Sequence, residues 1–303
     1  MAGRRTRKKR EEHVSFFYQN TQLGLSIRFT HVPGGYTSVH YHDSVEIVYP
    51  LNGDASIQVE GKTYNLPKRQ VTVVGAGKLH STHTHDTWGM ALAIHVTKQA
   101  LVSIIPDIES YHLNCIPDEV TTEQFPAYRE LCEIMEKITR SYISGKGAFE
   151  MEACGLILQA IALLIQNFSV SDISGTKTSA AAASEPIRQT IRYVEENFKE
   201  IITLDDVCEL TGYGKESFCR LFKRKMGMSF LKYLNEVRLT HCCHELAATD
   251  DPISMIMERN GIRGQKQFNA SFKALYGMTP SEIRKQAYAS TNAKEMPEDP
   301  AVV

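Results

Sequence analysis

Residues 204–223 read LDDVCELTGYGKESFCRLFK, and residues 253–273 read ISMIMERNGIRGQKQFNASFK. Both stretches pass from a short helical pattern through a glycine, Gly212 or Gly261, into a second helical pattern. The second pattern has two phenylalanines four residues apart, a spacing that puts both rings on one face of a helix. A short helix, a tight turn and a second helix form the helix-turn-helix motif, whose second helix enters the major groove of DNA. The sequence therefore predicts two DNA-binding motifs in one helical domain.

Further residues around and between the motifs follow a known pattern. They are Arg220-Leu221-Phe222-Lys223 with Gly227, then Tyr233-Leu234 and Arg238-Leu239, then Phe268, Ser271-Phe272-Lys273 and Gly277-Met278-Thr279-Pro280. On these residues, the region from about Ile187 to Lys285 resembles the DNA-binding domain of the AraC family of transcription regulators. The resemblance implies seven helices, two recognition helices one duplex turn apart on the same face, and double-stranded DNA as the partner. RNA polymerase is a further partner if the protein is an activator.

The first recognition helix is predicted to combine a buried face with a DNA-contacting face. Phe218 and Phe222 are expected in the core. The polar residues are assigned as Glu216, Cys219 and Arg220 toward base edges, and Lys215, Lys223 and Arg224 toward phosphates. Arg220 is the strongest base-reading candidate, because a guanidinium can hold O6 and N7 of guanine together. The alternative is that these charges are solvated and give only nonspecific attraction.

The second motif departs from the family pattern. It reads Gly261-Ile262-Arg263-Gly264 where the family usually has Gly-Phe-Ser-Asp, and Ala270 stands where related sequences often have Arg. The glycine at position 264 weakens the start of the helix. The residues that retain hydrogen-bonding capacity toward DNA are Arg263, Gln265, Lys266 and Asn269. Direct base contact and phosphate anchoring alone both remain open for this helix.

The length and composition predict a folded chain of about two domains. A chain of 303 residues exceeds the size at which a single core usually stops growing, and 42% hydrophobic with 23% charged residues is typical of globular proteins. We predict a basic arm at 1–14, an effector-sensing domain with a possible dimerisation role at 15–168 and a linker at 169–185. The DNA-binding domain is predicted at 186–288 and a disordered tail at 289–303.

Charge and cysteine usage favour a cytoplasmic protein. The formal net charge is -1, yet residues 187–288 contain 16 Lys and Arg against 13 Asp and Glu, a net charge of +3. Seven scattered cysteines without a CxxC pair indicate reduced thiols. The basic start leads into Glu11 and Glu12, and no apolar run has the length of a membrane span, so we expect neither a signal peptide nor membrane insertion. The basic run itself is either a solvated tail or an arm that adds DNA affinity.

The N-terminal half changes from a strand pattern to a helical one. From Leu25 to about His95, short apolar or alternating runs are separated by turns such as Asn52-Gly53 and Glu60-Gly61, which predicts a β-barrel or sandwich. From Phe125 onward, apolar residues fall at helical spacing in two runs joined around residues 144–147. We expect an amphipathic helical pair that can mediate a homodimer.

Histidines and a carboxylate have a regular spacing in the strand region. The pattern is Gly34-x5-His40-Tyr41-His42-x3-Glu46-x6-Gly53, followed by Gly75-Ala76-Gly77-Lys78-Leu79-His80. Because side chains alternate along a strand, His40, His42 and Glu46 are expected on one face. With His80 from another strand they can form a cluster of three histidines and one carboxylate, a set suited to Zn, Fe, Mn or Ni. This spacing resembles the metal-binding signature of cupins.

Several interpretations of this cluster remain open. AraC-type regulators resemble cupins, and their residues at this place often form a metal-free pocket in which imidazoles and a carboxylate hydrogen-bond a small-molecule effector or each other. A divalent metal is the possible cofactor of a second interpretation, a cupin enzyme fused to a DNA-binding module. In a third, the barrel is structural. The family resemblance favours a regulator that is not an enzyme, in which the effector changes the placement or dimerisation of the DNA-binding half.

The run His241-Cys242-Cys243-His244 has the residue types of a zinc site but not its spacing. Consecutive helical residues point about 100° apart, so four of them cannot converge on one tetrahedral ion. We expect Cys242 in the core. The predicted fold class is α+β multidomain, with an N-terminal cupin-like β-barrel and helical pair followed by an all-α double helix-turn-helix domain.

Overall fold

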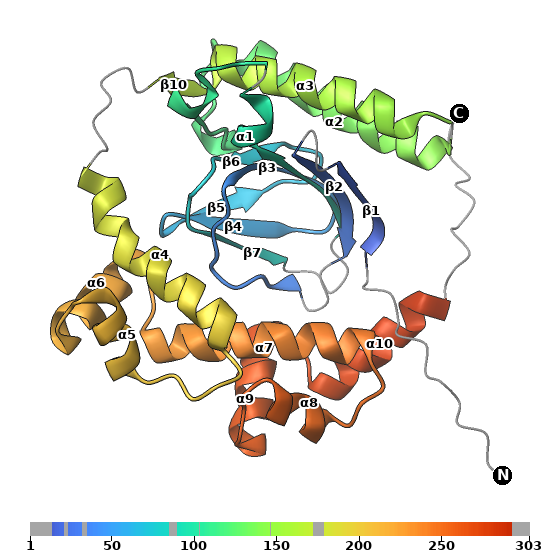
Figure 1. The fold of residues 1–303 in the computed structure, drawn as a ribbon. Helices are drawn as coiled ribbons and strands as arrows, with labels where there is room; N and C mark the ends of the chain where they lie inside the picture. The colour runs from blue at the N-terminus through green and yellow to red at the C-terminus, as the bar shows by residue number, and fades with distance from the viewer. Residues whose placement is uncertain are drawn as a thin grey trace.

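A sheet-rich N-terminal domain and a helical C-terminal domain make up the computed structural model (Figure 1). It describes residues 14–20, 24–31, 35–84, 90–102, 104–145, 147–171 and 179–292. The predicted α+β multidomain architecture is confirmed. Of the two predicted tails, residues 1–13 and 293–303 lie outside the described residues, whereas the last helix continues to Asn292, past the predicted boundary at 289.

The first eight strands of the described residues form two antiparallel sheets, and glycines occupy two of the turns between these strands. The five-stranded sheet has the order β1 (Val14–Asn20), β2 (Leu25–His31), β8 (Met90–Thr97), β3 (Ser44–Asn52) and β6 (Thr72–Val74). The three-stranded sheet has the order β5 (Lys62–Leu66), β4 (Ala55–Val59) and β7 (His80–Thr84). Gly53 and Gly61 have φ of 77° and 85°, values that favour glycine, at the two turns that the sequence predicted.

Helices cover one face of the five-stranded sheet (Figure 1). The connecting elements are α1 (Lys98–Leu101), η2 (Ile108–Ser110), η3 (Pro117–Glu119) and the paired strands β9 (Tyr111–Leu113) and β10 (Ser169–Ser171). The helical pair is α2 (Phe125–Ser144) and α3 (Phe149–Asn167). Ile47 and Tyr49 of β3 pack in one core with Leu131 and Ile157 of this pair. Because strand side chains alternate, Glu46 of β3 points to the other face.

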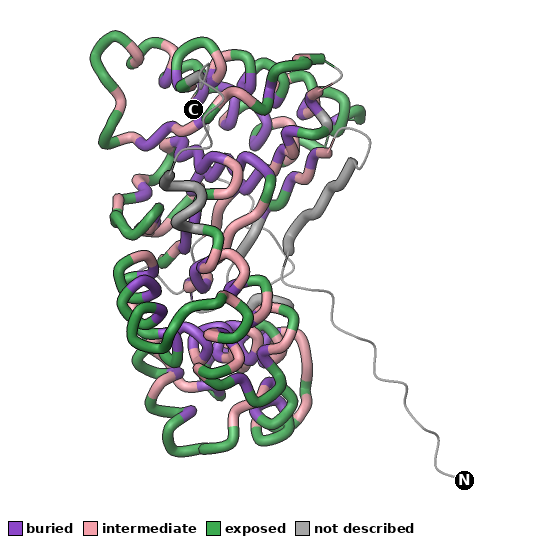
Figure 2. The backbone as a smooth tube through the Cα atoms, turned by 60° about the vertical axis from the view of Figure 1, so that its left-hand side comes forward, coloured by how far each residue is buried: buried purple, intermediate pink, exposed green. Residues whose placement is uncertain are grey.

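Helix α3 is the one helix among the described residues that is long and apolar enough to cross a membrane. Its buried residues, including Ala153, Ile157 and Leu164, pack in the core of the N-terminal domain. At the top of Figure 2, the buried positions of the helices lie on the side that faces the sheets. A third of the apolar window is buried, and the helix of a folded domain passes the same test of length and composition.

Seven helices form the C-terminal domain in the described part of the chain, as the resemblance implied. They are α4 (Ser179–Asn197), α5 (Leu204–Thr211), α6 (Lys215–Met226), α7 (Phe230–Ala248), α8 (Ile253–Arg259), α9 (Gln265–Tyr276) and α10 (Pro280–Asn292). The two helix-turn-helix units are α5 with α6 and α8 with α9. Helix α7 runs below the N-terminal domain and joins the two units (Figure 1).

The predicted linker at 169–185 is shorter than the sequence pattern indicated. Ser169–Ser171 pairs with Tyr111–Leu113, and α4 begins at Ser179. The alanine run that lacks large apolar side chains is helical, because alanine has the highest helix propensity. Residues 172–178 lie outside the described residues.

Candidate functional site

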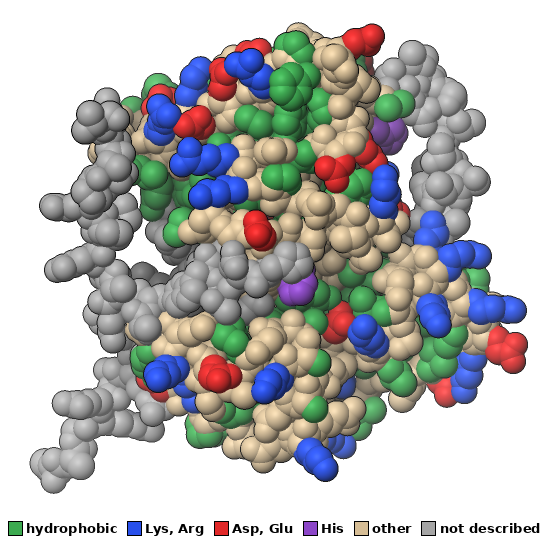
Figure 3. Space-filling view, turned by 180° about the vertical axis from the view of Figure 1, so that it is seen from behind, with side chains coloured by type: hydrophobic (Ala, Val, Ile, Leu, Met, Phe, Trp, Pro, Cys, Tyr) green, Lys and Arg blue, Asp and Glu red, His purple; other side chains and the backbone are tan. Residues whose placement is uncertain are grey.

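Helix α6 separates its buried and exposed residues as the sequence predicted for a recognition helix. Phe218 and Phe222 are fully buried. The six residues assigned to DNA are all exposed: Lys215, Glu216, Cys219, Arg220, Lys223 and Arg224. Lys and Arg side chains gather at the edge of the molecule where α5 and α6 lie (Figure 3). Lys215 already pairs with Asp205 at 2.6 Å between Nζ and Oδ1, so its contact with a phosphate requires that pair to open.

Helix α9 has the same scaffold but a less charged surface. Phe268 and Phe272 are buried, while Arg263, Gln265, Lys266 and Asn269 are exposed. The helix begins after Gly264, and no side chain caps its first turn. Helix α6 likewise begins after a glycine, Gly214, without a side-chain cap, so Gly264 does not distinguish the two helix starts. The free N–H groups of α9 point out of the helix end, where a phosphate is a favourable partner.

A groove of about 1220 Å³ lies between α7, the loop before α5 and the second unit, and the sequence pattern did not indicate it. Lys199, Lys232, Arg238 and Arg263 contribute positive charge to its lining. Arg238 connects α7 with the loop before α5. Its Nε donates to the Phe198 carbonyl at 2.7 Å, and its Nη2 donates to the Glu200 carbonyl at 2.6 Å. Glu200 and Glu258 add negative charge to the same lining, which runs from the loop before α5 to the start of α9.

The turn glycine of the second unit is required by this packing. Gly261 has φ of 73°, and a Cβ there would lie 2.8 Å from the Lys199 carbonyl oxygen and 2.9 Å from that of Phe198. Both contacts are shorter than side-chain carbons tolerate. The second unit therefore sits against the loop before α5 at a distance that only glycine allows.

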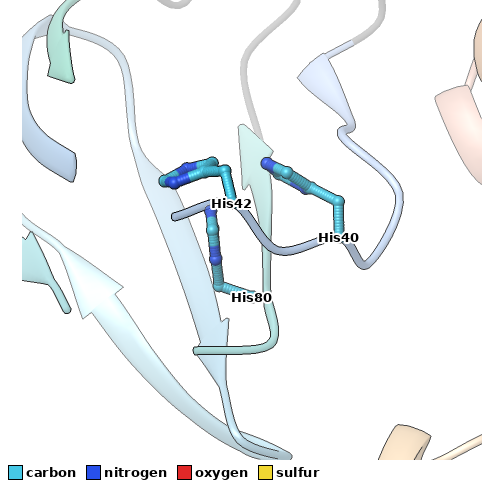
Figure 4. A group of neighbouring side chains, drawn as sticks. All are labelled: His40, His42 and His80. Atoms are coloured by element: carbon cyan, nitrogen blue, oxygen red, sulfur yellow. The ribbon is translucent and has the colours of Figure 1, made fainter. Parts of the chain in front are cut away.

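In the N-terminal domain, the four residues predicted as a cluster come together, and a fifth joins them. His80 Nε2 lies 2.9 Å from Glu46 Oε2, and His42 Nε2 lies 3.5 Å from the same oxygen. The His40 ring centroid is 4.2 Å from that of His80 (Figure 4). His95 of β8 approaches the other carboxylate oxygen, with 3.7 Å between Nε2 and Oε1. We call His40, His42, Glu46, His80 and His95 the His/Glu cluster.

The sequence pattern missed His95 because its position depends on strand pairing. His95 is the cross-strand partner of Glu46 in the antiparallel pair of β3 and β8. Paired residues point to the same face, so this register brings the imidazole to the carboxylate. The two residues are separated by 49 positions and belong to no common motif. The strand pattern was expected to reach about His95, but no local spacing shows that this strand pairs with Glu46.

Three of the imidazoles are fixed by backbone carbonyls. Nδ1 of His40 lies 2.9 Å from the Ser38 carbonyl, Nδ1 of His42 lies 2.9 Å from that of Ser44, and Nδ1 of His80 lies 2.8 Å from that of Lys78. A ring that donates through Nδ1 leaves the lone pair of Nε2 free to accept a hydrogen bond or bind a metal. The Nε2 atoms of His42 and His80 and Oε2 of Glu46 are buried and have no hydrogen-bond partner of good geometry.

The two domains resemble two described families of domain. Residues 22–166 match the AraC-like ligand binding domain, and residues 207–286 match a helix-turn-helix domain. The chain belongs to the AraC family of transcription regulators. The predicted class of protein, a DNA-binding transcription regulator with an N-terminal ligand-binding domain, is confirmed.

Several known proteins are similar to the chain over most of its length. The melibiose operon regulatory protein of Escherichia coli (strain K12) is 22% identical over 292 residues, which are 92% of this chain and 92% of that protein. An HTH-type transcriptional regulator of Staphylococcus aureus (strain COL) is 21% identical over 253 residues, 84% of this chain and 33% of that protein. The crystal structure of ToxT from Vibrio cholerae O395 covers 87% of this chain at 10% identity, with a TM-score of 0.47.

Electrostatics in the ligand-binding domain of this AraC-family chain favour a charged carboxylate with two neutral imidazoles, His40 and His95, beside it. Burial raises the pKa of Glu46, but the adjacent His42 and His80 imidazoles outweigh it and hold that pKa well below its usual value. Burial lowers the pKa of His40 and of His95 to about 4. Burial also lowers the pKa of His80, but the Glu46 carboxylate reverses the direction and the net shift is upward. The buried carboxylate therefore favours its charged form, His40 and His95 favour the neutral form, and the contact with Glu46 favours the protonated form of His80.

The consecutive histidines and cysteines of α7 do not converge. Cys242 and Cys243 are buried in the second unit's core, as predicted for Cys242. His241 stacks on Phe198 with 3.8 Å between ring centroids, and His244 is exposed on the helix surface. In the described residues, the groups with metal-ligand geometry all belong to the His/Glu cluster.

Proposed function

We propose that this AraC-family regulator binds its effector at the His/Glu cluster and reads its operator with α6 and α9. The observation that supports the effector site is the convergence of the His42 and His80 Nε2 atoms, in rings held through Nδ1, on the buried Glu46 carboxylate without a hydrogen bond of good geometry. Buried polar groups without partners cost free energy unless a ligand satisfies them. The occupant we infer is a small polar molecule that donates to the imidazoles and the carboxylate, bound directly or through a divalent metal ion.

The experiment is a ligand screen by thermal melting, followed by one triple variant. A compound that binds the folded state raises the melting temperature of the wild-type chain. Replacing His40, His42 and Glu46 by Ala, Ala and Gln should abolish that rise, whereas the surface variant His112→Ala should retain it. Equal stabilisation of the folded triple variant would place the effector site elsewhere in the chain.

A metal-bound cluster is a second candidate, and the donor set favours it. Neutral imidazole nitrogens with one carboxylate suit Zn, Fe, Mn or Ni, and histidine ligands usually donate their other ring N–H to a carbonyl, as His40, His42 and His80 do. Metal bound there would hold a polar effector by its own charge. Elemental analysis after mild purification should find about one equivalent of metal, and chelation should change operator affinity. A metal-free protein that responds fully to its effector would contradict this candidate.

The DNA-binding proposal assigns Glu216, Cys219 and Arg220 to base edges and Lys223 and Arg224 to phosphates. Selection of duplexes by the full-length chain from a random DNA pool should return a shared motif. Affinity for that motif should fall steeply with added salt, as counterions are released from contacted phosphates. Absence of any enriched sequence, together with no binding at low salt, would contradict the assignment.

The partners follow from the same function. We propose a homodimer through α3, because Met151 is 78% and Leu158 is 40% exposed on its outer face. RNA polymerase is a partner if the protein activates transcription. The regulatory relatives support a protein without enzymatic activity that acts in the cytoplasm, where the DNA is.

A further inference from the structure

The backbone segments around His40 and His80 have one face toward the His/Glu cluster and a second face on the opposite side. His40 and His80 exchange both backbone hydrogen bonds, each at 2.9 Å, as an antiparallel pair. Directly opposed residues of such a pair point to one face, and their neighbours point to the other. Val39, Tyr41 and Leu79 therefore lie on the face opposite the imidazoles of His40 and His80.

That opposite face is part of the core of the DNA-binding domain. Val39 and Leu79 are 4% and 2% exposed and belong to one apolar cluster with Ile187, Ile191 and Val194 of α4. The same cluster contains Phe218 and Phe222, the buried face of recognition helix α6. A continuous packed core thus connects the backbone beneath the His/Glu cluster with the helix that faces DNA.

Polar contacts tie the same segments to α4. Arg192 Nη2 lies 3.2 Å from the Tyr41 hydroxyl, to which it donates, and the Arg188 guanidinium lies 5.7 Å from the centre of the Tyr41 ring. Arg188 Nη2 also donates to the Gly77 carbonyl at 2.9 Å, and the Gly77 N–H donates to the His42 carbonyl at 2.8 Å. We call Tyr41, Arg188 and Arg192 the Tyr41 clasp.

We propose that the Tyr41 clasp couples the state of the His/Glu cluster to the position of α4 and thereby to operator binding. The inference rests on the proposed function, since it takes the cluster as the sensing site. A ligand that draws His40, His42 and His80 together turns the peptide units that they share with Val39, Tyr41 and Leu79. Packed cores do not absorb such shifts continuously, so α4 and the α6 packed on it move with them.

The experiment is a double-mutant cycle in the full-length chain, with operator affinity as the measured quantity. The duplex is the sequence that the wild-type chain selects from a random pool. Glu46→Gln keeps the side-chain shape but removes the charge at the centre of the cluster, and Tyr41→Ala removes the clasp. In the wild-type background we expect Glu46→Gln to change the operator Kd by about 5–150-fold, the usual range of allosteric coupling. In the Tyr41→Ala background the same change should shift Kd by less than about twofold.

Two further variants distinguish loss of the Tyr41 clasp from a general loss of stability. Tyr41→Phe keeps the ring under Arg188 but removes the contact with Arg192, so the effect of Glu46→Gln should fall between the two backgrounds. Tyr64→Ala removes an exposed contact with Glu119, and the effect of Glu46→Gln should there equal that in wild type. Far-UV circular dichroism and melting establish that each variant is folded.

Outcomes against the clasp differ from outcomes against the proposed function. Equal Kd changes in the wild-type and Tyr41→Ala backgrounds, or no effect of Glu46→Gln on operator affinity at all, would overturn the coupling. A wild-type chain that selects and binds no duplex would instead overturn the proposed DNA-binding residues.

Discussion

The two helix-turn-helix units share one scaffold and differ in their surfaces. Equivalent residues occur fifty positions apart: Gly214 and Gly264, Phe218 and Phe268, Phe222 and Phe272, Gly227 and Gly277, Met228 and Met278. Gly227 and Gly277 end α6 and α9 in the left-handed region, with φ of 71° and 69°. The exposed face of α6 is strongly basic, whereas α9 has mainly amides and alanines there. The comparison shows that the fold constrains the glycines and aromatics and leaves the polar face free to specialise.

The supporting helices of the two units also differ. Helix α5 begins with a capping box, in which Thr203 accepts from the Asp206 N–H and Asp206 accepts from the Thr203 N–H. Helix α8 follows Pro252 with no side-chain cap. It is held at its other end, where Asn260, fully buried, donates to Glu245 at 2.9 Å. The first unit is stabilised locally and the second by contacts with α7.

The largest expected effect tests whether the two cores are equivalent. Phe222→Ala and Phe272→Ala should each lower the free energy of unfolding by about 3–5 kcal/mol, because both rings are fully buried. Denaturant unfolding of the full-length chain measures the loss. Phe125→Ala, at a ring that is 54% exposed, is the matched control and should change stability little. A large loss at only one of the two buried positions would break the equivalence.

The second prediction tests the difference between the two surfaces. Arg220→Ala should weaken operator binding by about 1–3 kcal/mol and relax the preference at one base position, since a bidentate contact is lost. Lys223→Ala should weaken all sequences alike and reduce the salt dependence. Asn269→Ala should cost less than Arg220→Ala, because its amide has no charge. An equal, base-specific loss at Asn269 would show that both helices read bases.

The third prediction concerns the local stabilisation of the first unit. Thr203→Ala should cost about 1 kcal/mol of unfolding free energy, since it removes the side-chain cap of α5. The comparison variant Ser254→Ala lies on the exposed surface of α8, which has no such cap, and should have a smaller effect. Both are measured by urea unfolding at neutral pH. Equal effects would mean that the cap does not stabilise the first unit.

The smallest expected effect depends on pH and involves the first turns of α5 and α10. Backbone and side-chain hydrogen bonds from Thr203 lower the pKa of Asp206, and those from Thr279 lower that of Glu282. A lowered folded-state pKa means that the stabilisation is complete above the ordinary carboxyl value near 4 and is lost as the pH falls through the folded value.

Asp206→Asn and Glu282→Gln should therefore reduce the urea midpoint at about pH 6 and lose their effect toward about pH 2. Glu196→Gln, at an exposed carboxylate, is the control. A midpoint difference that persists unchanged to the lowest pH would contradict the assignment of the charged form.

The helical spacing of apolar residues and the positions of turn glycines were enough to predict the helical domain. The phenylalanine pairs and glycine turns of residues 204–223 and 253–273 specify two motifs without any knowledge of long-range contacts. The same local rules predicted the hairpin turns at Gly53 and Gly61 and the two helices that follow Phe125. They overestimated the linker, because an alanine-rich run without large side chains is compatible with both a linker and a helix.

The DNA-contacting residues and the effector site remain predictions, although their placement fits the proposal. Exposure of Arg220 and Asn269 follows from helical periodicity alone. The assembly of the His/Glu cluster needed more than periodicity, since His42 and Glu46 are separated by a bend at Asp43 rather than carried on one continuous strand. Their convergence depends on the backbone path through Ser44 and on the bridge between His40 and His80.

The sequence by itself determined the tandem motifs through local spacing and the class of protein through its resemblance to a known family. It also predicted His40, His42, Glu46 and His80 as cluster residues from two separate segments. Only the tertiary structure decided that His95 faces Glu46 and that Tyr41 meets Arg192, whose positions differ by 49 and 151 residues. Strand register sets the first contact, and the packing of the N-terminal domain on α4 sets the second. Both depend on burial shared between distant segments, which no local pattern in the chain records.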